Sequence, residues 1–196
     1  MKKNTIILTL CLWCMALAVQ AQHIPTLEEA VYGGLIRTEV GGSVNWMKDG
    51  EHYSKIERND AGGFDVMAYS AKDNSKEVLI PGDKLVNPEN GKPIRVRSFA
   101  FSEDNNQVLI YTNTRRVWRL DTRGDYWVLN IQTGKLQQLG KARPEATLMF
   151  AKFSPDGTKV AYVSQNNIYV ETLADGSVLQ LTKDGNEKIV NGTFDW

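Results

Sequence analysis

The sequence contains very little cysteine or histidine and shows no excess of charge of either sign. Of its 196 residues, two are cysteine and two are histidine, and 23 basic side chains balance 23 acidic ones. Proteins that bind nucleic acid usually present a basic face, so this neutrality argues against a nucleic-acid partner. The sequence also lacks a His-x-x-x-His pair and a Gly-x-x-x-x-Gly-Lys phosphate loop, and we therefore predict no metal or other cofactor.

Long apolar runs are absent after the first 21 residues. Lys2 and Lys3 precede an apolar stretch, residues 5–19, and the small residue Ala21 follows at the end of this region. This pattern is typical of a cleaved secretory signal, which predicts that residues 1–21 are removed and that the protein is exported to the periplasm or outside the cell. A membrane anchor is the alternative, but a spanning helix needs about 20 apolar residues, and no basic segment follows this run.

Cleavage there would remove both cysteines and leave 175 residues, enough for one ordinary domain. The mature chain would be slightly acidic and would have no disulfide, thiolate nucleophile or cysteine metal site. It would also lack a membrane segment. Residues 22–42 are predicted to form an N-terminal segment with a short helix, which Thr26 caps with Glu29 as its box partner. Residues 43–196 contain frequent glycine turns between clusters of β-branched and aromatic residues, a composition that favours strands.

One pattern recurs three times in the β-rich region. Each copy has an aromatic strand end, a polar turn and an apolar strand, and the aromatic anchors Trp46, Phe101 and Phe153 are 55 and 52 residues apart. A period near 50 residues lies in the range of propeller blades. We expect these aromatic residues to belong to the core between blades rather than to a ligand site.

The last copy shows a blade most completely. Its four predicted strands are residues 148–153, 159–163, 167–172 and 177–182, separated by tight turns. The corresponding later strands of the other two copies are residues 126–130, 135–139, 64–69 and 77–80, and a fourth copy is expected to start at residues 186–196. A propeller closes with about four to eight blades, so the sequence predicts an all-β fold with part of a propeller, and a chain that is incomplete relative to the working protein.

The second copy carries an insertion, residues 112–124, that is rich in arginine. It contains Arg115, Arg116, Trp118, Arg119 and Arg123. Two interpretations remain open. The first is a solvated loop in which arginines pair with Asp121 and Asp125, at about 0–1 kcal/mol for each pair. The second is a clamp for an anion or a carbonyl group, because a planar guanidinium supplies several directed donors.

No catalytic motif is visible in the 196 residues. There is no Gly-x-Ser-x-Gly elbow for a hydrolase nucleophile. The two histidines, His23 and His52, are not paired with serine and aspartate in a recognisable motif, and both are predicted to be surface residues. We therefore predict that this chain alone does not hydrolyse peptides.

Several motifs resemble one peptidase family. Trp118-Arg119, followed by a strand rich in aromatic residues at 125–130, resembles the second-blade region of the dipeptidyl peptidase IV branch of the prolyl oligopeptidase family. Residues 150–170 and the Asp195-Trp196 ending are similar to the same family. The resemblance implies that the complete protein has an eight-bladed propeller and an α/β-hydrolase domain with a Ser-Asp-His triad.

The resemblance also implies a function. Members of the family remove dipeptides, preferably with proline second, from peptides with a free N-terminus, and a glutamate motif that grips this terminus follows the Asp-Trp pair. By position, Arg119 would help to orient the substrate's backbone carbonyl, which makes it the predicted substrate-binding residue of this chain. The family relation allows for a homodimer of the complete protein. A prolyl tripeptidyl peptidase and a non-catalytic, TolB-like propeller scaffold that binds periplasmic proteins remain as alternatives.

Overall fold

The structure is a computed structural model, and it describes residues 24–32, 44–60, 62–117 and 119–194. The chain divides into two compact units, residues 1–41 and 42–196. The predicted signal at residues 1–21, together with His23, lies outside the described residues.

In the first unit the described part is a short helix, α2 (Leu27–Val31). The hydroxyl of Thr26 accepts a hydrogen bond from the backbone amide of Glu29 (3.2 Å), and the Glu29 carboxylate accepts one from the Thr26 amide (2.9 Å). The predicted capping box is therefore confirmed. No helix within the described ranges is both long enough and apolar enough to cross a membrane.

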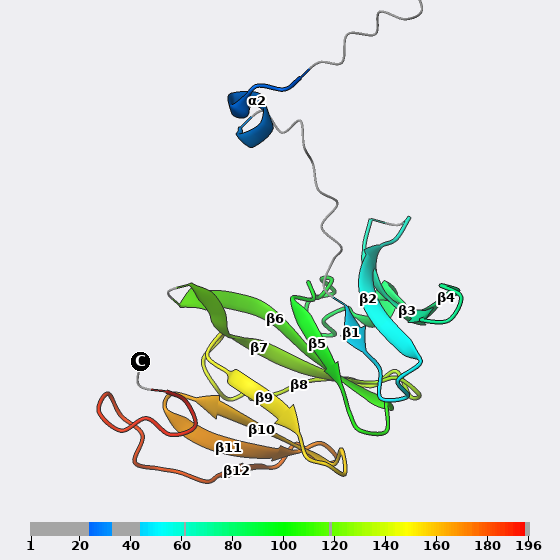
Figure 1. Cartoon of the computed structure of the whole chain (residues 1–196). Helices are drawn as coiled ribbons and strands as arrows, with labels where there is room; N and C mark the ends of the chain where they lie inside the picture. The colour runs from blue at the N-terminus through cyan, green and yellow to red at the C-terminus, as the bar shows by residue number, and fades with distance from the viewer. Residues whose placement is uncertain (1–23, 33–43, 61, 118, 195–196) are drawn as a thin grey trace, which may run out of the picture. The chain divides into compact units, whose positions relative to one another are not determined.

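The second unit contains three four-stranded antiparallel sheets, each built from strands that are consecutive in the chain (Figure 1). Blade 1 consists of β1 (Asn45–Trp46), β2 (His52–Arg58), β3 (Phe64–Ser70) and β4 (Lys76–Ile80). Blade 2 consists of β5 (Ser98–Phe101), β6 (Gln107–Val117), β7 (Leu120–Asn130) and β8 (Leu136–Gln138). Blade 3 consists of β9 (Met149–Phe153), β10 (Lys159–Ser164), β11 (Asn167–Thr172) and β12 (Val178–Gln180). A 3₁₀ turn, η1 (Gly82–Lys84), follows blade 1.

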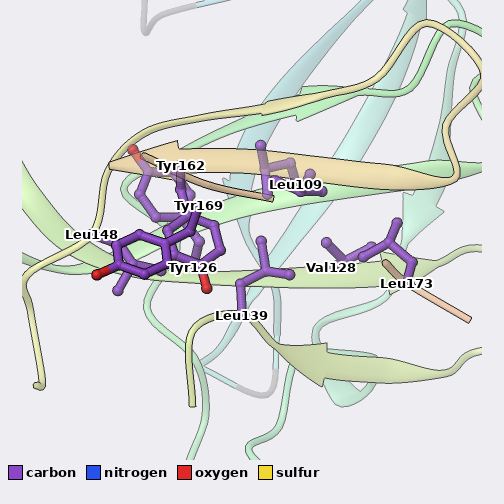
Figure 2. Close-up of a cluster of buried hydrophobic side chains, with 9 residues drawn as sticks. Leu109, Tyr126, Val128, Leu139, Leu148, Tyr162, Tyr169 and Leu173 are labelled. Carbon is purple, nitrogen blue, oxygen red and sulfur yellow. The ribbon is translucent and has the colours of Figure 1, made fainter. Parts of the chain in front are cut away.

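Blade 2 is buried on both faces, because it lies between two hydrophobic cores. Successive side chains of a strand point to opposite sides, so alternate residues enter different cores. On β6, Val108 and Ile110 join a core shared with Val66 and Ile80 of blade 1. The intervening Leu109 joins a second core, which blade 2 shares with blade 3 (Figure 2). The continuous apolar runs in β6 and β7 follow from this arrangement, since neither face of the central part of the blade meets water.

The three sheets confirm the predicted all-β fold with three four-stranded blades, and the predicted strands agree with the observed ones to within two residues at each end, except that the strand predicted at residues 126–130 begins at Leu120. One core assignment is wrong, because Trp46 is 62% exposed. Phe101 and Phe153, in contrast, pack against the two cores.

The predicted fourth repeat at residues 186–196 does not begin with a strand as far as residue 194. The segment instead lies against blade 3. The amide of Asn191 donates to the carbonyl of Asn166 (3.1 Å), and a Cβ at Gly192 would stand 2.6 Å from the Val163 side chain.

Candidate functional site

The arginine-rich insertion is a continuation of the β6–β7 hairpin. In blade 3 the hairpin of β10 and β11 turns at Gln165 and Asn166, which both have positive φ, as a two-residue hairpin turn requires. In blade 2 the ladder continues beyond the equivalent point, as far as the Val117–Leu120 pair. We call residues 113–124 the ribbon. The insertion is therefore mostly paired strand and not a loop, although its described arginines are exposed, as the solvated interpretation expected.

The ribbon leaves the blade at an irregular point. The register of the ladder shifts between Thr112 and Arg115, and again between Arg115 and Arg116. Asn113 lies within the first of these shifts and has a φ of 45°, in the left-handed region that asparagine tolerates better than most residues. Irregularities of this kind bend a strand and increase its twist. The direction of the ribbon is thus set at its base, around Asn113.

A buried carboxylate holds this base. Asp125 is 8% exposed, and its Oδ1 accepts a hydrogen bond from the Ala146 amide (2.8 Å). Its Oδ2 accepts one from the Asn113 side-chain amide (2.7 Å), which also donates to Glu145 Oε1 (2.8 Å). The base of the ribbon is therefore tied to the connector between blades 2 and 3. A carboxylate buried in this way is stable because both oxygens have donors.

Close backbone contact beside Asp125 depends on a glycine. The amides of Gly124 and Leu148 each donate to the carbonyl of the other, at 3.0 Å in both directions. A Cβ at Gly124 would stand 2.5 Å from the Tyr111 ring and 2.6 Å from the Thr112 carbonyl. Because real Cβ atoms do not approach so closely, any larger residue would displace the base of the ribbon.

One side of the ribbon is supported by an aromatic stack. The rings of Tyr111 and Tyr126 are stacked with centroids 4.6 Å apart. The Tyr111 hydroxyl donates to the carbonyl of Asp121 in the ribbon (3.0 Å), and burial raises the pKa of this hydroxyl to about 12. Arg97 Nε lies 3.1 Å from the Asp121 carboxylate. The ribbon is therefore braced by residues of blade 2 and of the segment that leads into it.

Arg119, the predicted substrate-binding residue, lies in the turn that joins β6 to β7, and it is exposed. Arg115, Arg116 and Arg123 are exposed on the two strands of the ribbon. Trp118, the other member of the Trp-Arg pair, lies outside the described residues. The carboxylates predicted as partners of these arginines have other donors, because Asp121 pairs with Arg97 and Asp125 is bonded to Asn113 and Ala146.

Two clefts adjoin the ribbon. The larger, of about 810 Å³, is lined by the connector between blades 1 and 2, by the ribbon base and by the connector that follows blade 2, and its charged residues are Lys92, Arg95, Arg97, Asp121, Asp125 and Glu145. The smaller, of about 510 Å³, includes Asn45, Ile56, Leu120 and Phe150. Arg119 lines neither cleft.

Within the described ranges, no group of three or more histidine, cysteine, aspartate or glutamate side chains could hold a metal ion. His52 begins β2, and its Nδ1 lies 2.8 Å from the Asp49 carboxylate. Its side chain is partly exposed at the start of this strand, in agreement with the predicted surface position.

Sequence reasoning missed the residues that hold the ribbon. Asn113 and Gly124 were not singled out, and Asp125 was predicted only as an arginine partner, although a weak signal exists for its role at the ribbon base. Asp65, Asp125 and Asn167 occupy equivalent positions on the third strands of the three blades, and each accepts a hydrogen bond from a backbone amide of the connector that follows its blade. The amides belong to Gly82, Ala146 and Gly185. An Asp or Asn in the same place in every repeat could have indicated such a latch.

The fold and this ribbon define the class of the protein: it contains consecutive blades of a β-propeller, one of which carries an arginine-bearing extension.

Residues 102–196 match the family described as the dipeptidyl peptidase IV (DPP IV) N-terminal region. The chain is 29% identical over 186 residues to a probable dipeptidyl-aminopeptidase B of Chaetomium globosum, a match that spans 87% of this chain and 20% of the relative. It is 30% identical over 161 residues to dipeptidyl aminopeptidase B of Saccharomyces cerevisiae, spanning 78% and 18% of the two chains.

The structural comparison supports the same fold. The crystal structure of Porphyromonas gingivalis dipeptidyl peptidase 4 superposes with a TM-score of 0.66 at 22% identity, over 83% of this chain and 22% of that one. The family model and the curated relatives support an N-terminal propeller fragment of the dipeptidyl peptidase IV kind, and the superposed structure shows the same fold. The chain spans about a fifth of the length of the curated relatives that it matches.

Proposed function

We propose that this chain is the substrate-holding propeller part of an exported serine exopeptidase that removes dipeptides with proline in second place from peptide N-termini. The relatives above are named as dipeptidyl aminopeptidases, which supports the reaction class. The apolar segment at residues 5–19 supports export, because it has the pattern of a cleaved secretory signal. In this proposal the propeller restricts access and orients the peptide, and the triad is supplied by the rest of the complete protein.

The observation that carries the proposal is the position of Arg119. It is exposed at the turn of a braced ribbon, within the region that matches the family. A guanidinium offers several donors in a rigid plane, which suits a peptide carbonyl oxygen. The bonds of Asp125 and Gly124 at the base keep the ribbon from swinging freely. Arg119 can therefore act as a fixed donor that aligns a bound peptide before bond cleavage.

The test is an assay with a chromogenic Gly-Pro substrate on the protein made from its complete gene. We expect Arg119→Ala to lower kcat/KM by about ten- to hundredfold, the usual range for a hydrogen bond to a charged group. Arg119→Lys keeps the charge without the planar fork and should recover only part of the loss. Equal kcat/KM for the wild-type protein and Arg119→Ala would contradict the role of Arg119.

A second comparison tests the reaction itself. The 196-residue chain, which has no Gly-x-Ser-x-Gly motif, should leave the Gly-Pro substrate intact while the complete protein cleaves it. A serine-directed covalent inhibitor should abolish the activity of the complete protein. If the complete protein cleaves neither Gly-Pro nor other Xaa-Pro substrates, the proposed dipeptidyl peptidase function is wrong.

A further inference from the structure

Two arginines face each other across the ribbon. Arg115 and Arg123 are direct partners in the β6–β7 ladder, and both are exposed. Side chains at such positions have Cβ atoms about 4.5–5.5 Å apart, and like charges placed there destabilise an antiparallel pair. The ribbon thus concentrates positive charge at a position where the fold alone would favour a neutral or mixed pair.

No acidic side chain of the described residues neutralises this pair. Neither guanidinium forms an ion pair or hydrogen bond with any other described residue. Asp121, the one acidic residue in the ribbon sequence, is held by Arg97. Asp125 at the base is buried and has two donors of its own. The nearby carboxylates are therefore committed elsewhere, and the two guanidinium groups keep their donors available to a ligand.

The pair also lies beyond the packed part of the blade. The two hydrophobic cores include β6 and β7 residues only up to Tyr111 and from Tyr126 onward. Leu120, next to the turn, is 69% exposed. Replacing Arg115 or Arg123 would thus cost no core packing. Any role of these two arginines must therefore come from groups that they bind from solution.

We propose that Arg115 and Arg123 bind carboxylate side chains of the peptide substrate, so that the protein favours peptides with acidic residues downstream of the cleaved dipeptide. Guanidinium groups bind carboxylates through two parallel hydrogen bonds, and two guanidiniums side by side suit neighbouring acidic side chains. A bound carboxylate would also relieve their mutual repulsion. The balance of 23 basic and 23 acidic residues favours an acidic peptide over a nucleic acid. The inference rests on the proposed peptidase function but uses residues other than Arg119.

The first experiment uses the complete protein and two peptides, Gly-Pro-Glu-Glu-Glu-Glu and Gly-Pro-Gln-Gln-Gln-Gln. The wild-type protein should have the higher kcat/KM for the acidic peptide. The variant Arg115→Gln/Arg123→Gln should lower the acidic-to-neutral ratio by about two- to fivefold for each arginine removed, the range for exposed ion pairs. Arg58→Gln, an exposed arginine at the end of β2, is the matched control and should leave the ratio unchanged. A wild-type ratio of one, or an unchanged ratio in the double variant, would overturn the proposal.

Arg119→Ala separates this inference from the proposed function. It should lower turnover of both peptides and leave their ratio intact. The double variant should keep the wild-type melting temperature or exceed it, since it removes a repulsive pair, so a loss of preference cannot be ascribed to unfolding.

Binding gives a readout that does not depend on catalysis. A fluorescein-labelled, N-terminally blocked Glu₄ peptide should bind the wild-type protein at low salt, bind the double variant more weakly, and lose affinity as salt screens the charges. Equal binding by wild-type protein and double variant would overturn the proposal even if no peptide is cleaved. Tighter binding of a single-stranded oligothymidylate than of the Glu₄ peptide would also overturn it, because the ribbon would then be a general polyanion site.

Discussion

Blades 2 and 3 are built from one repeat, yet their central hairpins end differently. In blade 3 the hairpin turns at Gln165 and Asn166, directly after the buried pair Ser164 and Asn167. In blade 2 it continues into the ribbon. The cores on both sides of blade 2 contain no ribbon residue. A hairpin end is therefore a place where a blade can gain an extension without adding residues to either core.

The same comparison separates what is structural from what is special to the ribbon. Asp125 and Asn167 occupy equivalent positions, and each accepts a hydrogen bond from the connector that follows its blade, at 2.8 and 3.0 Å. Asp125 accepts a further bond from Asn113, the residue at the ribbon base, whereas Asn167 accepts its further bond from the Thr182 hydroxyl within blade 3 and its connector. One oxygen of Asp125 thus serves a latch common to all three blades. The other oxygen serves the ribbon.

The largest effect is expected in the part that the blades share. Leu129→Ala removes a side chain that is 1% exposed in the core between blades 1 and 2, and should lower the free energy of unfolding by about 2–5 kcal/mol. Leu179→Ala, on β12, is the control, because that side chain is 62% exposed and should change stability by less than about 0.5 kcal/mol. Urea unfolding followed by tryptophan fluorescence measures both. Similar losses in the two variants would contradict the difference in burial.

Gly124→Ala should break the junction between the ribbon and the next connector. The added methyl group meets the Tyr111 ring and the Thr112 carbonyl, so we expect destabilisation by about 1–3 kcal/mol, as for overpacking in general. Thr122→Ala, two residues away on β7, removes atoms instead of adding them and should cost less than about 0.5 kcal/mol. Thermal unfolding of the two variants decides the matter: a Gly124→Ala protein as stable as Thr122→Ala would mean that the close contact is not needed.

Asp125 allows the latch and the ribbon to be tested separately. Asp125→Ala leaves the Ala146 amide without its acceptor and should destabilise the protein by about 1–3 kcal/mol. Asp125→Asn should retain most of the stability, since Asn167 performs the same latch role in blade 3. It should nevertheless loosen the ribbon, because its amide would meet the Asn113 amide, donor against donor.

Hydrogen exchange with mass spectrometry distinguishes the two outcomes for Asp125. In Asp125→Asn, amides of residues 113–124 should exchange faster while those of blade 3 stay protected. Asp121→Asn, which removes the exposed pair with Arg97, is the control and should change stability by at most about 1 kcal/mol. Unchanged exchange across the ribbon in Asp125→Asn would show that Asn113 does not depend on the carboxylate.

These residues also show how far the sequence alone could lead. The repeat spacing of Trp46, Phe101 and Phe153 was sufficient for the blades, because strand pairing within a blade is local and follows from alternation and turns. The ribbon was detected as an insertion, but its strand character was missed, since runs of arginine give no apolar alternation. The latch made by Asp125 was also missed. The donor is a backbone amide 21 positions away, which any residue type supplies, so only the acceptor, an Asp or Asn repeated in each blade, leaves a signal in the sequence.

The smallest expected effect concerns the turns between the first two strands of blades 2 and 3. In blade 3 the Asp156 carboxylate accepts hydrogen bonds from the Ser154 hydroxyl (2.5 Å) and from the amide and hydroxyl of Thr158 (3.0 and 2.9 Å). These bonds, chiefly that of Ser154, lower its pKa from the ordinary 3.8 to about 2. In blade 2 Asp104 has a lowered pKa for the same reason, with Ser102 as the main donor.

A carboxylate with a lowered pKa binds protons less readily in the folded than in the unfolded chain, so its contribution is complete above pH 3.8 and disappears as the pH falls toward about 2. Asp156→Asn should therefore be less stable than the wild-type protein near neutral pH, and the difference should shrink across that acidic window. Asp104→Asn should behave alike if the two turns are equivalent. Chemical denaturation at a series of pH values tests this. A constant difference between wild type and Asp156→Asn down to about pH 2 would mean that the turn's hydrogen bonds do not depend on the charge of Asp156.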